Sequence, residues 1–171
     1  DVAIGNFGGP SGAGVARTLS KRLRDSGYFN IKAPGPGLFV VTGGSDGRRV
    51  DGTLTGPQGQ SMFRKGFKNA SIDVNIARLA DDITEAITGV PGINGTNLVF
   101  VGRSGGRKEI FQCLADGSGV KQLTRDRGIC VSPSFSTKGG YVAYTSYASG
   151  YPDIYTIHVD GSNRRRIINT P

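Results

Sequence analysis

Ala115-Asp116-Gly117-Ser118-Gly119 returns later in the chain as Val159-Asp160-Gly161-Ser162-Asn163, so that Asp160 stands 44 residues after Asp116. The same offset aligns the flanking segments without a gap. It places Leu98-Val99-Phe100-Val101 on Val142-Ala143-Tyr144-Thr145, Gly106 on Gly150, Glu109-Ile110-Phe111 on Asp153-Ile154-Tyr155, and Lys121-Gln122-Leu123 on Arg165-Arg166-Ile167. A period of this length, built from short strand-like runs, is typical of four-stranded β-propeller blades. The sequence therefore predicts propeller blades in the second half of the chain.

Seven strands are expected in this half, at residues 97–102, 109–114, 120–123, 131–136, 141–146, 153–159 and 164–168. The Asp-Gly pairs mark tight turns, because glycine adopts the positive φ that such turns require. These strands make roughly one and three-quarter blades, whereas closed propellers typically have about four to eight. An open array exposes faces that blades normally bury, so we expect self-association or lower stability than that of a closed ring.

The first half of the chain has a different pattern, in which strands alternate with helices. A strand at residues 2–7 precedes a helix near residues 11–25, where Val15, Leu19 and Leu23 recur every four residues. Further extended segments are expected at residues 28–32, at 38–42 as a fully buried strand, and at 48–55 and 60–68 as a hairpin.

A second helix is expected at residues 72–88, with Ser71 as its cap and Gly89 at its end. The sequence thus predicts an α+β amino-terminal domain at residues 1–92, followed by a partial all-β propeller at residues 93–171.

Composition and isolated motifs give little support for an enzyme. The chain has one histidine, His158, and no serine lies in a nucleophile elbow, so we expect no catalytic residues. A strand and a helix flank the glycine-rich segment at residues 5–14, which permits an anion-binding loop or a plain connection, but its glycines match neither the dinucleotide-binding nor the nucleotide-binding pattern. No metal or cofactor site is expected. No apolar run approaches the about 20 residues of a membrane span, and the opening residues read as strand, which suggests a removed natural amino terminus.

Two cysteines, Cys113 and Cys130, lack metal-ligand spacing. They either pair as a disulfide or fill core positions, and the alignment of Cys113 with the apolar Ile157 favours the core for Cys113.

The net charge of +8 raises the question of a nucleic-acid partner. Its densest basic run is Arg164-Arg165-Arg166. Because alternate strand residues face opposite sides, three adjacent arginines cannot form one flat row of phosphate contacts. A solvated outer strand is favoured, an acidic protein or envelope surface comes next, and nucleic acid comes last.

Several motifs resemble the TolB family, and the likeness covers nearly the whole chain. It rests on the order of the α+β domain and on these segments: Leu79-Ala80-Asp81-Asp82-Ile83, the join Ile87-Thr88-Gly89-Val90-Pro91-Gly92-Ile93, Arg103-Ser104-Gly105-Gly106-Arg107-Lys108-Glu109-Ile110, Leu123-Thr124, Ser132-Pro133-Ser134-Phe135-Ser136 and Tyr144-Thr145-Ser146.

The resemblance implies a non-enzymatic periplasmic protein with an α/β domain and a six-bladed propeller. Members of the family work with the lipoprotein Pal and the inner-membrane protein TolA in outer-membrane integrity and in constriction at cell division. Colicins exploit the family for import. The resemblance therefore implies a Pal-like lipoprotein as partner, with no nucleic acid and no membrane insertion.

Four departures from the family pattern limit what is carried over. The TolA-binding segment precedes the first strand in the family, and this chain is expected to begin after it, so TolA is a partner by resemblance only. Residues 33–37 stand where the family has a helical stretch, so that either the helix is lost or the sequence omits residues there. Four blades are not represented. The usual Ser-Pro-Asp-Gly blade corner appears as Ser136-Thr137-Lys138-Gly139.

Candidate binding residues lie in loops that would share one face of a propeller, at residues 103–107, 125–129 and 147–151. They are of types enriched in protein interfaces, although ordinary solvated loops have a similar composition. The candidate protein-binding residues are Arg103, Arg107, Arg125, Arg127, Tyr147 and Tyr151. The alternative function is a propeller that gates or accompanies a peptidase or hydrolase, which would require a catalytic module elsewhere.

Overall fold

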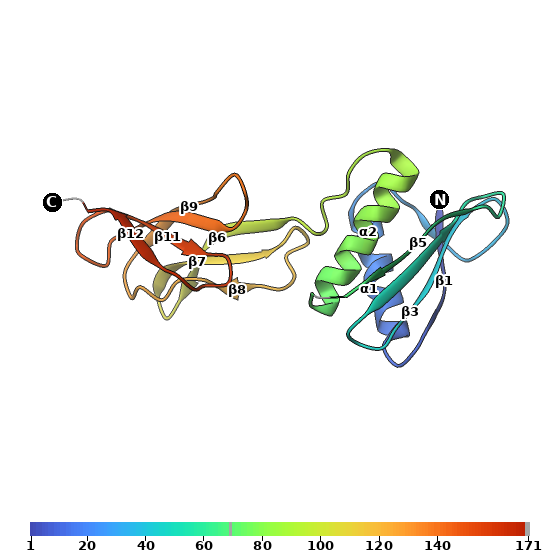
Figure 1. Ribbon diagram of the computed structural model, residues 1–171, viewed down its shortest axis with the longest axis horizontal. Helices are drawn as coiled ribbons and strands as arrows, with labels where there is room; N and C mark the ends of the chain where they lie inside the picture. Colours follow the sequence, from blue (N-terminus) through green and yellow to red (C-terminus); the bar gives the residue numbers. More distant parts are fainter. Residues whose placement is uncertain (69, 170–171) are drawn as a thin grey trace. The chain divides into compact units, whose positions relative to one another are not determined.

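The computed structural model describes residues 1–68 and 70–169, which form two compact units divided between Thr96 and Asn97. Unit 1 contains both helices and a five-stranded sheet, and unit 2 contains a three-stranded and a four-stranded sheet (Figure 1). The change of architecture thus falls four residues after the boundary expected at residue 92.

The sheet of unit 1 has the strand order β2-β1-β3-β4-β5. Its strands are β1 (Val2–Gly8), β2 (Ile31–Lys32), β3 (Phe39–Ser45), β4 (Val50–Thr55) and β5 (Ser61–Phe67). Strands β2 and β3 run parallel to β1, and β3, β4 and β5 are antiparallel neighbours. The expected hairpin is confirmed as β4 and β5.

Helices α1 (Gly12–Asp25) and α2 (Ile72–Thr88) lie on the same face of this sheet (Figure 1). The expected cap of α2 is confirmed, because the Ser71 hydroxyl accepts a hydrogen bond from the Val74 amide, and Gly89 ends the helix with a φ of 73°. The apolar stripes of both helices pack on the sheet. The fully buried aliphatic side chains of this core include Val2, Leu19, Leu23, Val41, Val50, Leu54, Leu79 and Ile83.

Two expectations for the sheet are wrong in detail. Strand β3 is not fully buried, because helices cover one face only, and Val41 and Ser45 are its two buried residues. The extended segment expected at residues 28–32 forms a strand only at Ile31–Lys32. Strands β2 and β3 lie on either side of β1 and run parallel to it. Residues 33–38 join these two strands and contain no helix.

The glycine-rich turn between β1 and α1 has a packing role. Gly9 has a φ of 86°, and a Cβ at Gly12 would lie 2.2 Å from the carbonyl oxygen of Phe7. Glycine is therefore required here by backbone conformation and by close approach of the chain to itself. These contacts favour the plain connection over an anion-binding loop.

Unit 2 consists of strands in two antiparallel sheets. The three-stranded sheet contains β6 (Asn97–Ser104), β7 (Arg107–Leu114) and β8 (Lys121–Gln122). The four-stranded sheet contains β9 (Cys130–Phe135), β10 (Tyr141–Ser146), β11 (Asp153–His158) and β12 (Arg165–Ile168), in the order β12-β11-β10-β9. All seven expected strands are present, although β8 is shorter than the predicted segment at residues 120–123.

The 44-residue offset is reproduced in three dimensions. Phe100 and Phe111 stack with their ring centroids 5.8 Å apart, and Tyr144 and Tyr155, at the equivalent positions of the repeat, stack at the same distance. The core of unit 2 draws on both sheets. Its buried members are Ile110, Leu123, Cys130, Val142, Tyr144, Tyr155 and Ile157.

Candidate functional site

Three loops at one end of the unit 2 sheets contain or border all six candidate binding residues, and we call these loops, together with Arg103 and Arg107, the loop cluster. The loops are the β6–β7 turn, the β8–β9 loop and the β10–β11 loop. The β6–β7 turn is a two-residue connection, in which Gly105 and Gly106 both have positive φ and Ser104 pairs with Arg107. This geometry is favoured in tight hairpins, and it sets Arg103 and Arg107 on either side of the turn.

Three of the six candidates line one hollow. Its volume is about 370 Å³, and the β6–β7 turn and the β8–β9 loop both contribute to it. The lining residues are Arg103, Gly106, Arg107, Lys108, Arg127, Gly128 and Ile129. Four basic side chains thus gather at one hollow, whereas Arg125, Tyr147 and Tyr151 are not among its lining residues. Lys108, which pairs with Arg103 across the hairpin, was missed as a candidate.

The β10–β11 loop lies beside the β8–β9 loop. A Cβ at Gly128 would lie 3.0 Å from the Cα of Ala148, and the Tyr147 amide donates to the carbonyl of Ile129 at 2.9 Å. Tyr147 and Tyr151 are 42% and 57% exposed, so both rings remain accessible next to the basic hollow.

A buried glutamate holds the β8–β9 loop in place. Glu109, at 3% exposure, accepts a hydrogen bond from the Thr124 hydroxyl at 2.5 Å and from the amides of Asp126 and Arg127 at 3.3 Å each. Arg127 has a φ of 56°, a conformation that non-glycine residues seldom adopt. The carboxylate therefore stabilises a strained turn that carries a basic candidate residue.

Asp126 and Arg164 form the most extensive side-chain network beneath the loop cluster. Arg164 donates from Nε to Asp126 Oδ1 at 2.8 Å and from Nη2 to Oδ2 at 2.7 Å. Its Nε also donates to the Tyr144 hydroxyl at 3.0 Å, and its guanidinium lies 3.8 Å from the ring centroid of Tyr155. Burial acts to raise the pKa of Asp126, but hydrogen bonds, chiefly from Arg164, outweigh it and hold that pKa below its usual value.

The expected outer strand is confirmed, because β12 is the edge of its sheet and all three arginines of the run are exposed, but two of them also form ion pairs. Arg164 is bound to Asp126, and Arg166 forms an ion pair with the buried Asp153 at 3.4 Å. Asp153 also accepts a hydrogen bond from Ser149 in the β10–β11 loop at 2.9 Å. Since Asp153 is the repeat equivalent of Glu109, both repeats use a buried acid at this point to hold a neighbouring loop. The 44-residue offset aligns Glu109 with Asp153, but the offset alone did not predict that both acids hold a loop.

Neither cysteine forms a disulfide, and both thiols are buried. Burial is the main cause that raises the pKa of the Cys130 thiol to about 12, which keeps it protonated at neutral pH. His158 is a partly exposed strand residue, 3.0 Å from Asp160 and edge-on to the ring of Tyr141. These positions agree with structural roles for all three side chains.

In residues 1–68 and 70–169, no group of three or more His, Cys, Asp or Glu side chains is arranged to hold a metal ion. Over the same residues, neither helix is both long and apolar enough to cross a bilayer.

Comparison with known proteins identifies relatives along most of the chain. A protein TolB homolog of Chlorobaculum tepidum is 44% identical and matches 81% of this chain and 38% of its own length. The Tol-Pal system protein TolB of Azoarcus sp. (strain BH72) is 33% identical and matches 90% of the chain and 42% of its own length. That of Bordetella pertussis is 29% identical over 98% of the chain and 45% of its own length. No family model matches.

The crystal structure of TolB from Acinetobacter baumannii superposes with a TM-score of 0.78 and covers 98% of this chain and 49% of that chain. At 21% identity this likeness establishes the fold alone. The chain spans less than half the length of each of these relatives. Together the sequence and structural matches show that the chain is TolB-like across the part of a TolB protein that it spans.

Proposed function

We propose that this chain is a non-enzymatic, protein-binding part of a Tol-Pal system, acting in the periplasm. The relatives named Tol-Pal system protein TolB support this function, and the paired sheets of unit 2 support its assignment as propeller blades. In this proposal residues 93–171 form two propeller blades, the first of which lacks a strand, and residues 1–92 form the amino-terminal domain. The chain would contribute to outer-membrane integrity and to constriction at cell division.

The loop cluster is the proposed docking surface for a Pal-like lipoprotein. The observation that carries this proposal is the convergence of Arg103, Arg107 and Arg127 on one hollow of about 370 Å³, beside the exposed rings of Tyr147 and Tyr151. Arginine and tyrosine are enriched at the energetic centres of protein interfaces. TolA remains a partner of the system by resemblance, and no residue of this chain is assigned to it.

Charge reversal tests this surface. The double variant Arg103→Glu and Arg125→Glu should weaken binding of the lipoprotein by at least about tenfold, because like-charge contacts at an interface are costly. Isothermal titration calorimetry measures the change. The matched control is Lys138→Glu, since Lys138 is exposed in the β9–β10 loop at the opposite end of β10. Equal affinities for the double variant and for the control would remove the loop cluster from the interface.

A further inference from the structure

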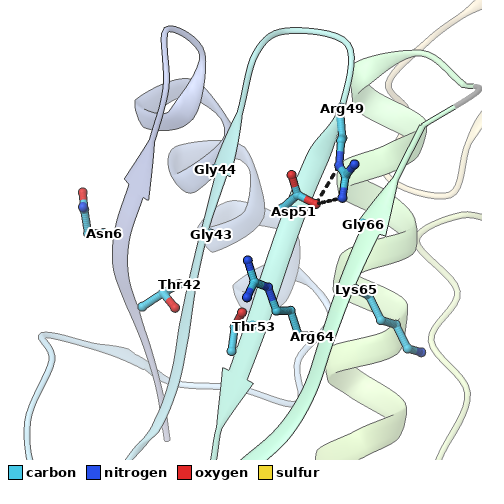
Figure 2. Close-up of a pocket in the computed structure, with 10 residues that line it drawn as sticks. All are labelled: Asn6, Thr42, Gly43, Gly44, Arg49, Asp51, Thr53, Arg64, Lys65 and Gly66. Atoms are coloured by element: carbon cyan, nitrogen blue, oxygen red, sulfur yellow. Dashed lines mark hydrogen bonds and ion pairs between the residues drawn. The ribbon is translucent and has the colours of Figure 1, made fainter.

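The helix-free face of the unit 1 sheet contains a second and wider hollow, of about 700 Å³. Figure 2 shows its residues, which come from β1, β3, β5 and β4 with the turn before it. They are Asn6, Thr42, Gly43, Gly44, Arg49, Asp51, Thr53, Arg64, Lys65 and Gly66. Helices α1 and α2 cover the opposite face, and no described element of unit 1 covers this one.

Strand register places three polar side chains in one row across this face. Thr42 pairs with Thr53, and Thr53 pairs with Arg64. Directly paired residues project from the same side of a sheet. Arg64 is exposed, and among the described residues it forms no ion pair. In Figure 2 its guanidinium extends over the sheet toward Thr53 and Gly43. The row therefore ends in one uncompensated positive charge.

A second row forms the floor of the hollow. Asp51 is flanked in register by Gly44 and Gly66, so no side chain stands beside it on β3 or β5. Arg49 lies over this row and pairs with Asp51 at 2.6 Å. A Cβ at Gly66 would lie 2.6 Å from Arg49 Nη2 and from Asp51 Oδ1, so a side chain there would displace the pair from its present position. This pairing neutralises Asp51 and leaves the charge of Arg64 dominant.

Lys65 does not add to this positive charge, although its backbone borders the hollow. Its side chain forms an ion pair with Asp82 of α2 at 2.8 Å. In Figure 2 it points away from Arg64, as alternation along β5 requires. Among the residues that line the hollow, Arg64 is thus the cationic side chain whose charge is available to a ligand.

We propose that this face binds an acidic, extended peptide segment of a partner protein, with one carboxylate seated on Arg64. Guanidinium and carboxylate groups form strong bidentate hydrogen bonds. The Thr42 and Thr53 hydroxyls can donate to further acceptors of the same segment. Neighbouring strands lie about 4.8 Å apart, so the row spans about 10 Å, close to the length of three extended residues.

The lining favours protein over nucleic acid as the occupant. None of the ten lining residues is aromatic, whereas single strands are usually held by base stacking on aromatic rings. Arg49 and Lys65 are already paired with Asp51 and Asp82, so the lining that the structure describes offers one available cation, whereas a chain of phosphates is usually held by several. A peptide can place a single carboxylate on Arg64.

The test uses the whole chain and a fluorescein-labelled peptide of alternating Glu and Ser residues, with binding followed by fluorescence anisotropy. Arg64→Gln should weaken binding about tenfold, since it removes the charged partner of a bidentate contact. Thr53→Val keeps the shape of the side chain and should weaken binding about threefold through loss of its hydroxyl. An alternating Gln and Ser peptide should bind at least about tenfold more weakly than the acidic one.

Two matched variants separate this face from general charge effects. Arg17→Gln removes an exposed charge from α1 in the same unit, and Lys138→Gln removes an exposed charge from the β9–β10 loop of unit 2; neither should change the affinity. The proposal is overturned if either control weakens binding as much as Arg64→Gln, or if the acidic peptide does not bind. Tighter binding of a single-stranded oligonucleotide than of the peptide at equal ionic strength would instead assign the face to nucleic acid.

Discussion

Arg164→Gln should destabilise unit 2 by about 2–3 kcal/mol, because it removes the cation that pairs with Asp126. Hydrogen bonds to charged groups contribute about 1.5–3 kcal/mol each. The Arg164 side chain is 37% exposed, so solvent screening reduces the paired bonds to Asp126 to about 1.5–2 kcal/mol together. The lost contact with the ring of Tyr155, at 3.8 Å, adds about 0.5–1 kcal/mol.

The neighbouring Arg165 provides the matched control. It is exposed in β12, and Arg165→Gln should change stability by less than about 0.5 kcal/mol. Urea unfolding followed by tyrosine fluorescence suits this measurement, because the chain has no tryptophan and five of its six tyrosines lie in unit 2. Equal losses of stability in the two variants would refute the assigned network.

The difference between wild type and Arg164→Gln should also depend on pH. The pKa of Asp126 is lowered in the folded state, so its contribution is complete above the unfolded value near 3.8 and is lost as pH falls through the folded pKa. In the variant, Arg164 no longer offsets the free-energy cost of burying the charged Asp126 carboxylate. Protonation of this carboxylate in acid removes that cost. The two unfolding free energies should therefore converge in acid, and a constant difference down to pH 2–3 would contradict the role of Asp126.

Two further changes test other contacts. Glu109→Gln should destabilise unit 2 by about 1–2 kcal/mol and speed hydrogen exchange at the Arg127 amide, because an amide NH₂ group replaces one acceptor oxygen; unchanged exchange there would contradict the assignment. Asp81→Ala should destabilise unit 1 by about 2 kcal/mol and speed exchange at the Gly95 amide, since the carboxylate of Asp81 accepts from Gly95 at 2.7 Å and twice from Asn94. Wild-type exchange at Gly95 in this variant would show that contacts other than those of Asp81 hold Asn94 and Gly95 in place.

Local signals in the sequence were enough to predict the helices and most strands. Ser71 and Gly89 mark the ends of α2 because capping chemistry acts within one turn of a helix. The 44-residue offset predicted equivalent strands because each repeat must bury equivalent side chains, as the two aromatic pairs show. The layering of unit 1 was not predicted correctly, because a short apolar run in β3 does not reveal whether a second layer covers the sheet.

The side-chain network under the loop cluster was not predicted, because its members are distant in sequence. Asp126 lies in the β8–β9 loop, and Arg164 lies just before β12. Within a run of three arginines, composition gives no sign of which of them form ion pairs or with which acids. The grouping of Arg103, Arg107 and Arg127 was anticipated from propeller geometry, and the part played by Lys108 required the hairpin register.

Hydrogen–deuterium exchange with and without a Pal-like lipoprotein tests the proposed function most directly. If the loop cluster is the docking surface, the lipoprotein should slow exchange in the β6–β7 turn, the β8–β9 loop and the β10–β11 loop together. The β9–β10 loop at the opposite end of the sheets should exchange as it does in the free protein. Protection confined to the β9–β10 loop or to unit 1, or no protection at a saturating concentration of the lipoprotein, would contradict the proposal.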